Sequence, residues 1–268
     1  MNQGDTMRIS NESLETIKKQ FILDCNLKEA EEIAPNKVYL SKTKELPGAR
    51  MVNQTDPFFR AIMFMDQVYI MADEKIYEGC REIFKNASPE WFCKFPNLRL
   101  IDTFLQDYGR EIADTHIYFL PDEDKADVLE TGSLIWLSRE DIEKIQEYNP
   151  FHNALCYSPT QPDVIAVALL DEKEDLKDKS LIEKIPFMKG MAGASLDGTH
   201  VRQIGIDVRD AYRKEGVGIY LTTLLKQRII KSGLLPFYGT SESHTISRSV
   251  AVKSGFLPAW CEIYVKRK

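Results

Sequence analysis

The sequence predicts a chain of the α/β (α+β) class with two domains, and three observations support this prediction. The chain has 268 residues, more than the roughly 100 to 200 residues of most single domains. Apolar residues make up 43% of it and aromatic residues 10%, which excludes a disordered, collagen-like or small disulfide-stapled chain. Strand-like and helix-like patterns alternate along both halves.

The first half is predicted to contain the order helix, two strands, two helices, strand. Apolar residues recur at helical spacing behind Ser10 or Asn11 as the cap, which predicts a helix over residues 11–25. The polar stretch that follows contains Pro and Gly, and we predict no helix or strand there. The further elements are a hairpin over 58–72 turned at Asp66-Gln67, helices over 73–86 and 96–108, and an alternating strand over 111–120.

A domain boundary is predicted at the run PDEDKAD, residues 121–127. This run is polar and charged and begins with Pro, which is the composition of a linker. We therefore expect a smaller α/β domain over residues 1–125, of unknown role, and a second domain over residues 126–268.

The second half is predicted to hold six strands, with helices among them. Ser138 supplies an N-cap for the first helix, and Gly233 ends the long helix that begins at Gly216. The charged segment 171–185 is predicted to be a solvated insertion, partly helical, at a hairpin tip. In order, the elements are a strand over 134–137, a helix over 138–149, strands over 164–170, 187–194 and 201–208, a helix over 216–231, a strand over 234–240, a helix over 244–254 and a strand over 259–265.

Composition excludes several classes of protein. The net charge of −6 has the wrong sign for a protein that neutralises nucleic-acid phosphates. No apolar run approaches the ~20 residues of a membrane span, and the N-terminus lacks a signal-peptide pattern. The five cysteines form no CxxC pair and the histidines no zinc-site spacing. We expect reduced thiols, a cytoplasmic location, no metal, and neither nucleic acid nor membrane as partner.

The segment 204–221, IGIDVRDAYRKEGVGIYL, carries the clearest chemical signal. A strand, a basic turn and then Gly216 and Gly218 at the start of a helix form a pattern that binds phosphate. The first amides of a helix have no partner within the helix and point outward with a positive dipole end. Arg213 and Lys214 add positive charge beside those amides.

The same segment resembles the central motif of the GNAT superfamily of N-acetyltransferases, which runs roughly V-x-P-x-Y-R-G-x-G-[IV]-G. A strand, a helix, the pair Gly255-Phe256 and a closing strand follow here, in the order usual for that family. The resemblance covers about residues 126–268 and implies a mixed, largely antiparallel sheet that splays at the cofactor site. The matching positions are Val208, Tyr212, Arg213, Gly216, Val217 and Gly218.

This resemblance implies acetyl-CoA as co-substrate and direct transfer of the acetyl group to a primary amine of a small molecule or peptide. The backbone of Ile206 and Val208 is expected to bind the pantetheine arm. His244 stands where the family often has an Asn near the cofactor, but it is equally suited to an N-cap. The pyrophosphate is expected on the amides of Arg213, Lys214, Glu215, Gly216, Val217 and Gly218.

The residues depart from the family pattern in ways that affect the cofactor turn and the acid. Asp210 replaces a common Pro, Lys214 a Gly, and Glu215 a frequently basic residue, and an acid beside a pyrophosphate weakens its binding. Ala251 stands where the family often has a Tyr that acts as general acid. Substitutes left open are Ser249, Tyr157, Tyr238 and water.

Two further groups are candidates for the acceptor side. Glu242 follows a strand that flanks the expected gap and is a candidate base, or else an acid that favours a helix start. The segment 149–157 lies where the family builds its acceptor pocket, although helix-end packing also explains it. It contains Cys156 and the candidate acid Tyr157, and we expect no covalent intermediate on Cys156.

Alternative functions are weighed beside this one. A non-catalytic acyl-CoA-binding or regulatory module would keep the cleft without the acid. A dinucleotide-binding domain is disfavoured, because Leu221 stands at the third glycine position and too little chain follows for the remaining strands. A P-loop is excluded by the absence of its motif. The acceptor is not readable, and a homodimer is left open.

Overall fold

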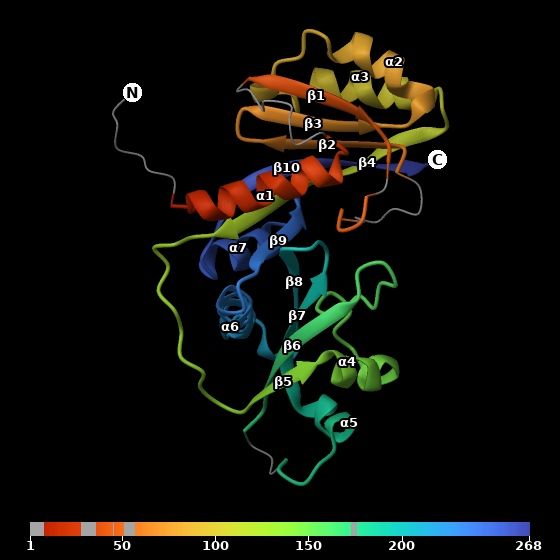
Figure 1. Cartoon of the computed structure of the whole chain (residues 1–268). Coiled ribbons are helices and arrows are strands. Elements are labelled where there is room, and N and C mark those ends of the chain that lie inside the picture. The colour runs from red at the N-terminus through yellow and green to blue at the C-terminus, as the bar shows by residue number, and fades with distance from the viewer. Residues whose placement is uncertain (1–7, 28–35, 45, 51–56, 173–175) are drawn as a thin grey trace. The chain divides into compact units, whose positions relative to one another are not determined.

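The computed structural model describes residues 8–27, 36–44, 46–50, 57–172 and 176–268. Figure 1 shows these residues as strands and helices that alternate along the chain. The strands are β1 (Lys37–Lys42), β2 (Phe59–Phe64), β3 (Gln67–Ala72), β4 (Arg110–Pro121), β5 (Leu134–Ser138), β6 (Asp163–Leu170), β7 (Met188–Leu196), β8 (Val201–Val208), β9 (Leu235–Ser241) and β10 (Phe256–Arg267). The helices are α1 (Asn11–Asp24), α2 (Glu74–Phe84), α3 (Phe95–Gln106), α4 (Arg139–Ile145), α5 (Leu181–Lys184), α6 (Val217–Lys231) and α7 (Thr245–Lys253).

The predicted α/β class with a mixed sheet is confirmed, and one strand was missed. β1 lies in the stretch for which no element was predicted, and it pairs in parallel with β3 from Lys37–Gln67 to Lys42–Ala72. Its sequence KVYLSK alternates only briefly and has lysines at both ends. Such a short pattern becomes a strand because β3 offers an edge to pair with, which the local sequence does not reveal.

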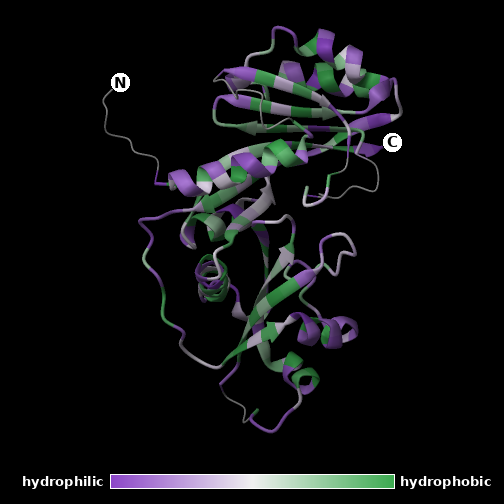
Figure 2. Cartoon of the chain, viewed as in Figure 1, coloured by the Kyte–Doolittle hydropathy of each residue, from purple (hydrophilic) through white to green (hydrophobic). Residues whose placement is uncertain are grey.

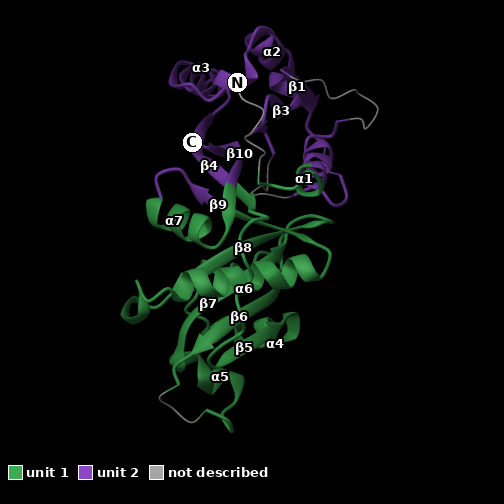
Figure 3. Ribbon diagram, turned by 90° about the vertical axis from the view of Figure 1, so that its left-hand side faces the viewer, with its two compact units in different colours: residues 1–14, 119–239, 245–257 green, residues 15–118, 240–244, 258–268 purple. Residues whose placement is uncertain are grey.

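The described residues cluster into two compact units that are not contiguous in sequence (Figure 3). Unit 1 contains residues 119–239 and 245–257 with the N-terminal stretch to Leu14. Unit 2 contains residues 15–118, 240–244 and 258–268. The predicted boundary after residue 125 concerns domains that fold independently, and it stays a prediction.

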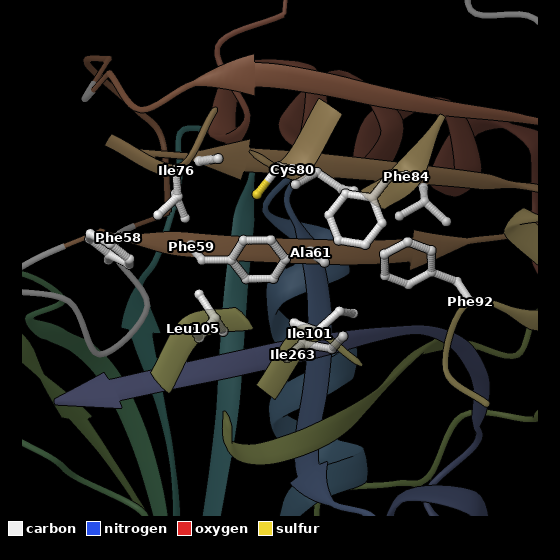
Figure 4. Packing of buried hydrophobic residues seen from close by; sticks show 13 residues of the cluster. Phe58, Phe59, Ala61, Ile76, Cys80, Phe84, Phe92, Ile101, Leu105 and Ile263 are labelled. Carbon is white, nitrogen blue, oxygen red and sulfur yellow. The ribbon is translucent and has the colours of Figure 1, made fainter. Parts of the chain in front are cut away.

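Unit 2 orders its strands β1-β3-β2-β10-β4, with α2 and α3 packed on one face. Asp73 caps α2, because its carboxylate accepts a hydrogen bond from the Lys75 amide at 2.9 Å. The apolar side of these two helices meets alternate residues of β2 and β3. Figure 4 shows this core, which includes Phe59, Ala61, Cys80, Phe84 and Ile101.

The other face of unit 2 buries a charged network under α1, whose turns carry hydrophobic and hydrophilic residues side by side (Figure 2). Arg50 donates to Asp24 at 2.6 Å and to Glu262 at 2.8 Å. Arg60 donates to the other oxygen of Glu262 at 2.7 Å. All four side chains are at most 3% exposed, so each charge depends on its partners rather than on water.

Unit 1 orders its strands β9-β8-β7-β6-β5, with β8 and β9 parallel and the others antiparallel. Helix α6 packs on one face and α4 on the other (Figure 1). Ser138 caps α4 with a capping box, as predicted. In the insertion 171–185 the structure forms the short helix α5, capped by Ser180, while residues 173–175 lie outside the described residues. Within the part described, no helix is long and apolar enough to cross a membrane.

Candidate cofactor site

The pairing between β8 and β9 stops while both strands continue. Their parallel register runs from Val201–Leu235 to Ile204–Tyr238, and β8 continues to Val208. On its other side β8 stays paired with β7 up to Val208. Among the described residues, the edge of β8 that faces β9 therefore has no paired strand from residue 205 onward.

The backbone groups on this edge belong to Ile206 and Val208. The Arg209 amide donates to the Lys189 carbonyl of β7 at 2.9 Å, so the backbone groups of residues 209, 207 and 205 point toward β7. Backbone groups alternate sides along a strand, and those of Ile206 and Val208 therefore point to the opposite edge. These are the two residues that the sequence predicted as partners of the pantetheine arm.

The turn after β8 presents backbone amides at the start of α6. Lys214 and Gly216 adopt left-handed backbone conformations, with φ of 70° and 84°. The amide of Tyr220 donates to the Gly216 carbonyl at 2.9 Å, which is the first hydrogen bond of the helix. The amides of the preceding first turn have no intrahelical acceptor. Gly216 is exposed, and a Cβ there would meet no atom within 4 Å.

The helix start lies directly against the free end of β8. A Cβ added to Gly218 would lie 3.3 Å from Val208 Cγ2 and 3.6 Å from Ile206 Cγ1. Strand edge and helix N-terminus are thus neighbours within one unit. The arrangement offers hydrogen bonds to an extended polar chain and, at its end, a positive dipole to an anion.

Side chains hold the turn from its strand side. Arg209 donates to the carbonyls of Met188 at 2.8 Å and Ile185 at 3.0 Å. The Tyr212 hydroxyl donates to Asp171 at 2.8 Å, and this hydrogen bond raises the pKa of Tyr212. Arg213 is exposed and paired with Asp210 at 3.0 Å, so the residue that replaces the family's Pro competes for one of the two cations of the turn.

The predicted acceptor segment 149–157 is packed on the face of β8 opposite the face that carries α6. Both carboxylate oxygens of Asp207 accept from Asn153, one from the amide at 2.6 Å and one from the side chain at 2.7 Å. A Cβ at Gly205 would lie 2.0 Å from the Asn153 carbonyl oxygen, and one at Gly193 2.2 Å from that of Ala154. The segment can lie this close to β7 and β8 only because both positions are glycine.

Tyr157 lies at the far end of this segment, over β6. Its amide donates to Asp163 at 2.8 Å, and its φ is 50°. Burial, together with the nearby Asp163 carboxylate, raises the pKa of Tyr157 to about 12. A phenol with this pKa stays protonated at neutral pH and can only donate a proton. Tyr157 therefore belongs to the same unit as the turn after β8. It lies over β6, however, which is two strands away from β8.

Cys156 beside it is exposed and lies in negative surroundings. Burial of its sulfur and the carboxylates of Asp163, Asp197 and Asp207 raise the pKa of this thiol. A thiol with a raised pKa is a poor nucleophile. The expectation that no covalent intermediate forms on Cys156 stays a prediction.

The remaining predicted residues include Glu242, His244, Ala251 and Tyr238. Glu242 and His244 belong to the segment 240–244, which groups with unit 2, so the structure does not bring them together with the turn in one unit. Both are exposed just before α7. Ala251 is fully buried on α7, and the Tyr238 hydroxyl makes a hydrogen bond with Ser247 at 2.9 Å.

Sequence reasoning missed the docking of Asn153 and the role of Gly193 and Gly205. Small residues do recur in MKGMAGASL, the sequence of β7, and VRQIGIDV, the sequence of β8, has a glycine inside the strand. Glycine inside a strand marks a close approach of another backbone, and this signal was available. In the described part of the chain, no group of His, Cys, Asp and Glu is arranged to hold a metal ion.

Comparisons with known proteins found similarity at the level of structure only. No protein-family model and no curated protein matches the chain. A GCN5-related N-acetyltransferase-like protein from Streptococcus suis is 12% identical with a TM-score of 0.44, and the match covers 94% of this chain and 98% of that one. A GNAT-family acetyltransferase from Colwellia psychrerythraea is 12% identical with a TM-score of 0.40, over 63% of this chain and 62% of that one.

A GCN5-related N-acetyltransferase from Kribbella flavida is 16% identical with a TM-score of 0.39, over 62% of each chain. The match therefore spans less than two thirds of the Colwellia and Kribbella proteins. The superfamily that the sequence resembles is also the superfamily of these structures. Identities and TM-scores this low define no activity, so support for a function has to come from the geometry of the chain itself.

Proposed function

We propose that the chain is an acetyl-CoA-dependent N-acetyltransferase that acts on a primary amine of a small molecule or peptide. One observation carries the proposal: the free edge of β8 at Ile206 and Val208 ends against the N-terminus of α6. This pair of features suits a ligand with an amide-containing arm and a phosphate group at its end. Acetyl-CoA has both, with a thioester at the other end of the arm.

In this proposal the pantetheine amides bind the backbone of Ile206 and Val208. The pyrophosphate lies on the amides of residues 214–218, where Arg213 and Lys214 add positive charge. The Arg213 amide, which the sequence also assigned to the phosphate, instead donates to the Asp210 carbonyl at 3.3 Å. Glu215 is exposed, so its carboxylate stays hydrated and lowers the affinity without blocking the site. These roles are mostly those of backbone groups, so the fold of the turn matters more than its side chains.

The acceptor approaches from the side of the segment 149–157. The three carboxylates that raise the pKa of Cys156 make this side negative, which favours a cationic amine. An ammonium group has no lone pair and must first lose a proton, for which Glu242 is the proposed base. The amine nitrogen then bonds to the thioester carbon and loses its second proton to water. The carbon–sulfur bond breaks, and the leaving thiolate takes a proton from water or Tyr157.

The buried Ala251 favours a second candidate function. With a methyl group where the family often has a tyrosine hydroxyl, α7 offers no proton donor at that position. A binder that senses acyl-CoA would keep the cleft and need no acid. Release of free thiol from acetyl-CoA in the presence of amines distinguishes the enzyme from the binder. The expected cytoplasmic location belongs to the proposal in either form.

Gly216→Asp tests the cofactor site, and Gly233→Asp is its matched control. Both glycines have a positive φ, at 84° and 77°, and open space around the missing Cβ, so the backbone strain of the two substitutions is similar. Only Gly216 lies at the helix start, where a carboxylate repels phosphate. Calorimetry with acetyl-CoA is expected to show binding lost in Gly216→Asp and kept in Gly233→Asp. Equal affinities of wild type and Gly216→Asp would remove the assignment.

A further inference from the structure

The segment that leads into β5 is tied to the first turn of α6. The Tyr220 hydroxyl accepts from the Thr131 amide and donates toward the carbonyls of Thr131 at 2.9 Å and Leu129 at 3.1 Å. Tyr220 is also the residue whose amide closes the first helical hydrogen bond, onto Gly216. The contact therefore acts on the turn of helix that presents its amides to the proposed phosphate site.

A second tie lies two turns further along the same helix. The Gln227 side chain donates to the Val128 carbonyl at 3.2 Å and accepts from the Val128 amide at 3.1 Å. Gln227 is 7% exposed, so this pair of hydrogen bonds is largely shielded from water. The segment 128–131 is thus fastened to one side of α6 at both ends of a two-turn span.

After residue 131 the segment turns and contacts the C-terminal end of β6. The residue that follows β6 holds Tyr212, at the start of the cofactor turn. Gly132, with a φ of 76°, leads into Ser133, whose carbonyl accepts from the Leu170 amide at 2.9 Å. Asp171, the next residue, accepts from Tyr212. Two tyrosine hydroxyls therefore flank residues 213–218, and both are anchored. Tyr220 is held by the backbone of residues 129–131 and Tyr212 by the Asp171 carboxylate.

We propose that residues 128–133 form a strap that positions the first turn of α6 for the phosphate of acetyl-CoA and is itself held more tightly when acetyl-CoA is bound. This inference rests on the proposed function, and in it a segment outside the cofactor turn regulates the binding of acetyl-CoA. Tyr220 is the positioning residue, since it connects the strap to the turn. It acts through the backbone amides and contacts no reacting atom.

The physical reason is preorganisation together with linkage. A helix start frays readily, and a ligand that needs several of its amides loses affinity if it must first order them. The strap lowers that loss by fixing the first turn in advance. Because coupling is reciprocal for binding free energies, bound acetyl-CoA must also stabilise the docked strap by the same factor.

Tyr220→Phe removes the hydroxyl and keeps the ring, and Tyr148→Phe is the control on an exposed tyrosine far from the strap in sequence. Acetyl-CoA affinity is measured by calorimetry on the full chain. We expect the dissociation constant of Tyr220→Phe to rise about fivefold or more, the scale of one net hydrogen bond, and that of Tyr148→Phe to stay unchanged. Thermal unfolding checks that both variants are folded.

A glutamate-specific protease, which can cut at Glu130, gives a readout that loss of stability alone would not produce. Acetyl-CoA is expected to slow this cut in the wild type. In Tyr220→Phe this protection should be smaller, by the factor by which the substitution weakens acetyl-CoA binding. An unaltered affinity of Tyr220→Phe, or a cleavage rate that acetyl-CoA leaves unchanged in the wild type, would overturn the strap. If the wild type itself binds no acetyl-CoA, the proposed function fails instead.

Gln227→Met keeps the inference testable if Tyr220→Phe does not fold. This variant removes the shielded pair with Val128 and keeps a side chain of similar volume. We expect faster cleavage at Glu130 and a weaker affinity for acetyl-CoA, by a smaller factor than in Tyr220→Phe. Faster cleavage with wild-type affinity would also reject the strap as a positioning element.

Discussion

Lys214 and Gly216 show how single residues shape the cofactor turn. Both have a positive φ, yet only glycine adopts this conformation without strain. The left-handed conformation of a lysine costs on the order of 1 kcal/mol of strain. The hydrogen bonds of Arg209 and Tyr212 on the strand side hold the turn in this conformation. Strain held at one residue of an exposed turn is typical of a site that is preformed for a ligand.

At the same scale, Glu242 can be tested as the proposed base. Glu242→Gln keeps the size and removes the base, so kcat/KM should fall about 100-fold or more, with the affinity for acetyl-CoA nearly unchanged. The acid limb of the pH profile should then be set by the deprotonation of the amine itself. The measurement is thiol release against the best amine found, across pH.

Glu140→Gln is the matched control, since Glu140 is also an acid at the start of a helix. It should leave both the rate and the acid limb unchanged. A wild-type kcat in Glu242→Gln would reduce Glu242 to a helix-start acid. The base would then have to be sought among the groups of the segment 149–157.

At the scale of elements, the segment 149–157 packs closely on two strands, β7 and β8. β7 and β8 carry glycine where the segment 149–157 crosses them, and Asp207 then fixes Asn153 with two hydrogen bonds. Asp207 lies between Ile206 and Val208. The same stretch of strand therefore presents backbone to the proposed cofactor at its edge and a side chain to the segment 149–157 on its face.

Gly205→Ala should disrupt this packing. The new Cβ would lie 2.0 Å from the Asn153 carbonyl oxygen, a backbone atom that must move. We expect a loss of about 1 to 3 kcal/mol in the free energy of unfolding, as for overpacked sites, measured by urea denaturation. Gly193→Ala should behave similarly, because its Cβ would lie 2.2 Å from the Ala154 oxygen.

Gly218→Ala is the stability control for these variants. Its Cβ would lie 3.3 Å from a valine methyl group, and alanine is the better residue in a helix. Its free energy of unfolding should therefore stay near the wild-type value or rise. A Gly205→Ala protein as stable as the wild type would mean that the segment is not held as tightly as the contacts indicate.

At the scale of the whole molecule, the buried charges of unit 2 set how stability depends on pH. Burial alone would raise the pKa of Glu262, but Arg50 and Arg60 outweigh burial and lower it to about 2. A carboxyl whose pKa is lower in the folded state contributes stability above its unfolded value, near 4.5, that is lost as pH falls toward 2. The chain should therefore lose stability steeply between about pH 5 and pH 2.

Glu262→Gln tests this directly. Removing one partner leaves buried arginine charge uncompensated, which should cost about 3 to 5 kcal/mol at pH 7, while the acid dependence becomes flatter. Thermal unfolding followed from pH 7 to pH 2 measures both effects. Glu82→Gln, which removes an exposed pair with Lys85, should change neither by more than about 1 kcal/mol. Parallel acid profiles of wild type and Glu262→Gln would reject the role of the network.

The elements that the sequence determined by itself are those with strong local signals. The cap at Ser138, the glycines at 109, 233 and 255, and the apolar periodicities predicted most helices and strands within a few residues. The turn from Arg213 to Gly218 was found for the same reason. Its amides and glycines are consecutive in sequence, so their chemistry can be read without knowing the fold.

Only the tertiary structure decided what lies beside these elements. β1 exists because β3 pairs with it, Gly205 matters because a carbonyl from residue 153 lies above it, and Glu262 joins arginines more than 200 residues away. The end of the β8–β9 ladder at Ile204 and Tyr238 is likewise a property of two strands together. Local sequence specifies local conformation, but close contacts, buried charge pairs and strand register arise between distant segments, and these are settled by packing alone.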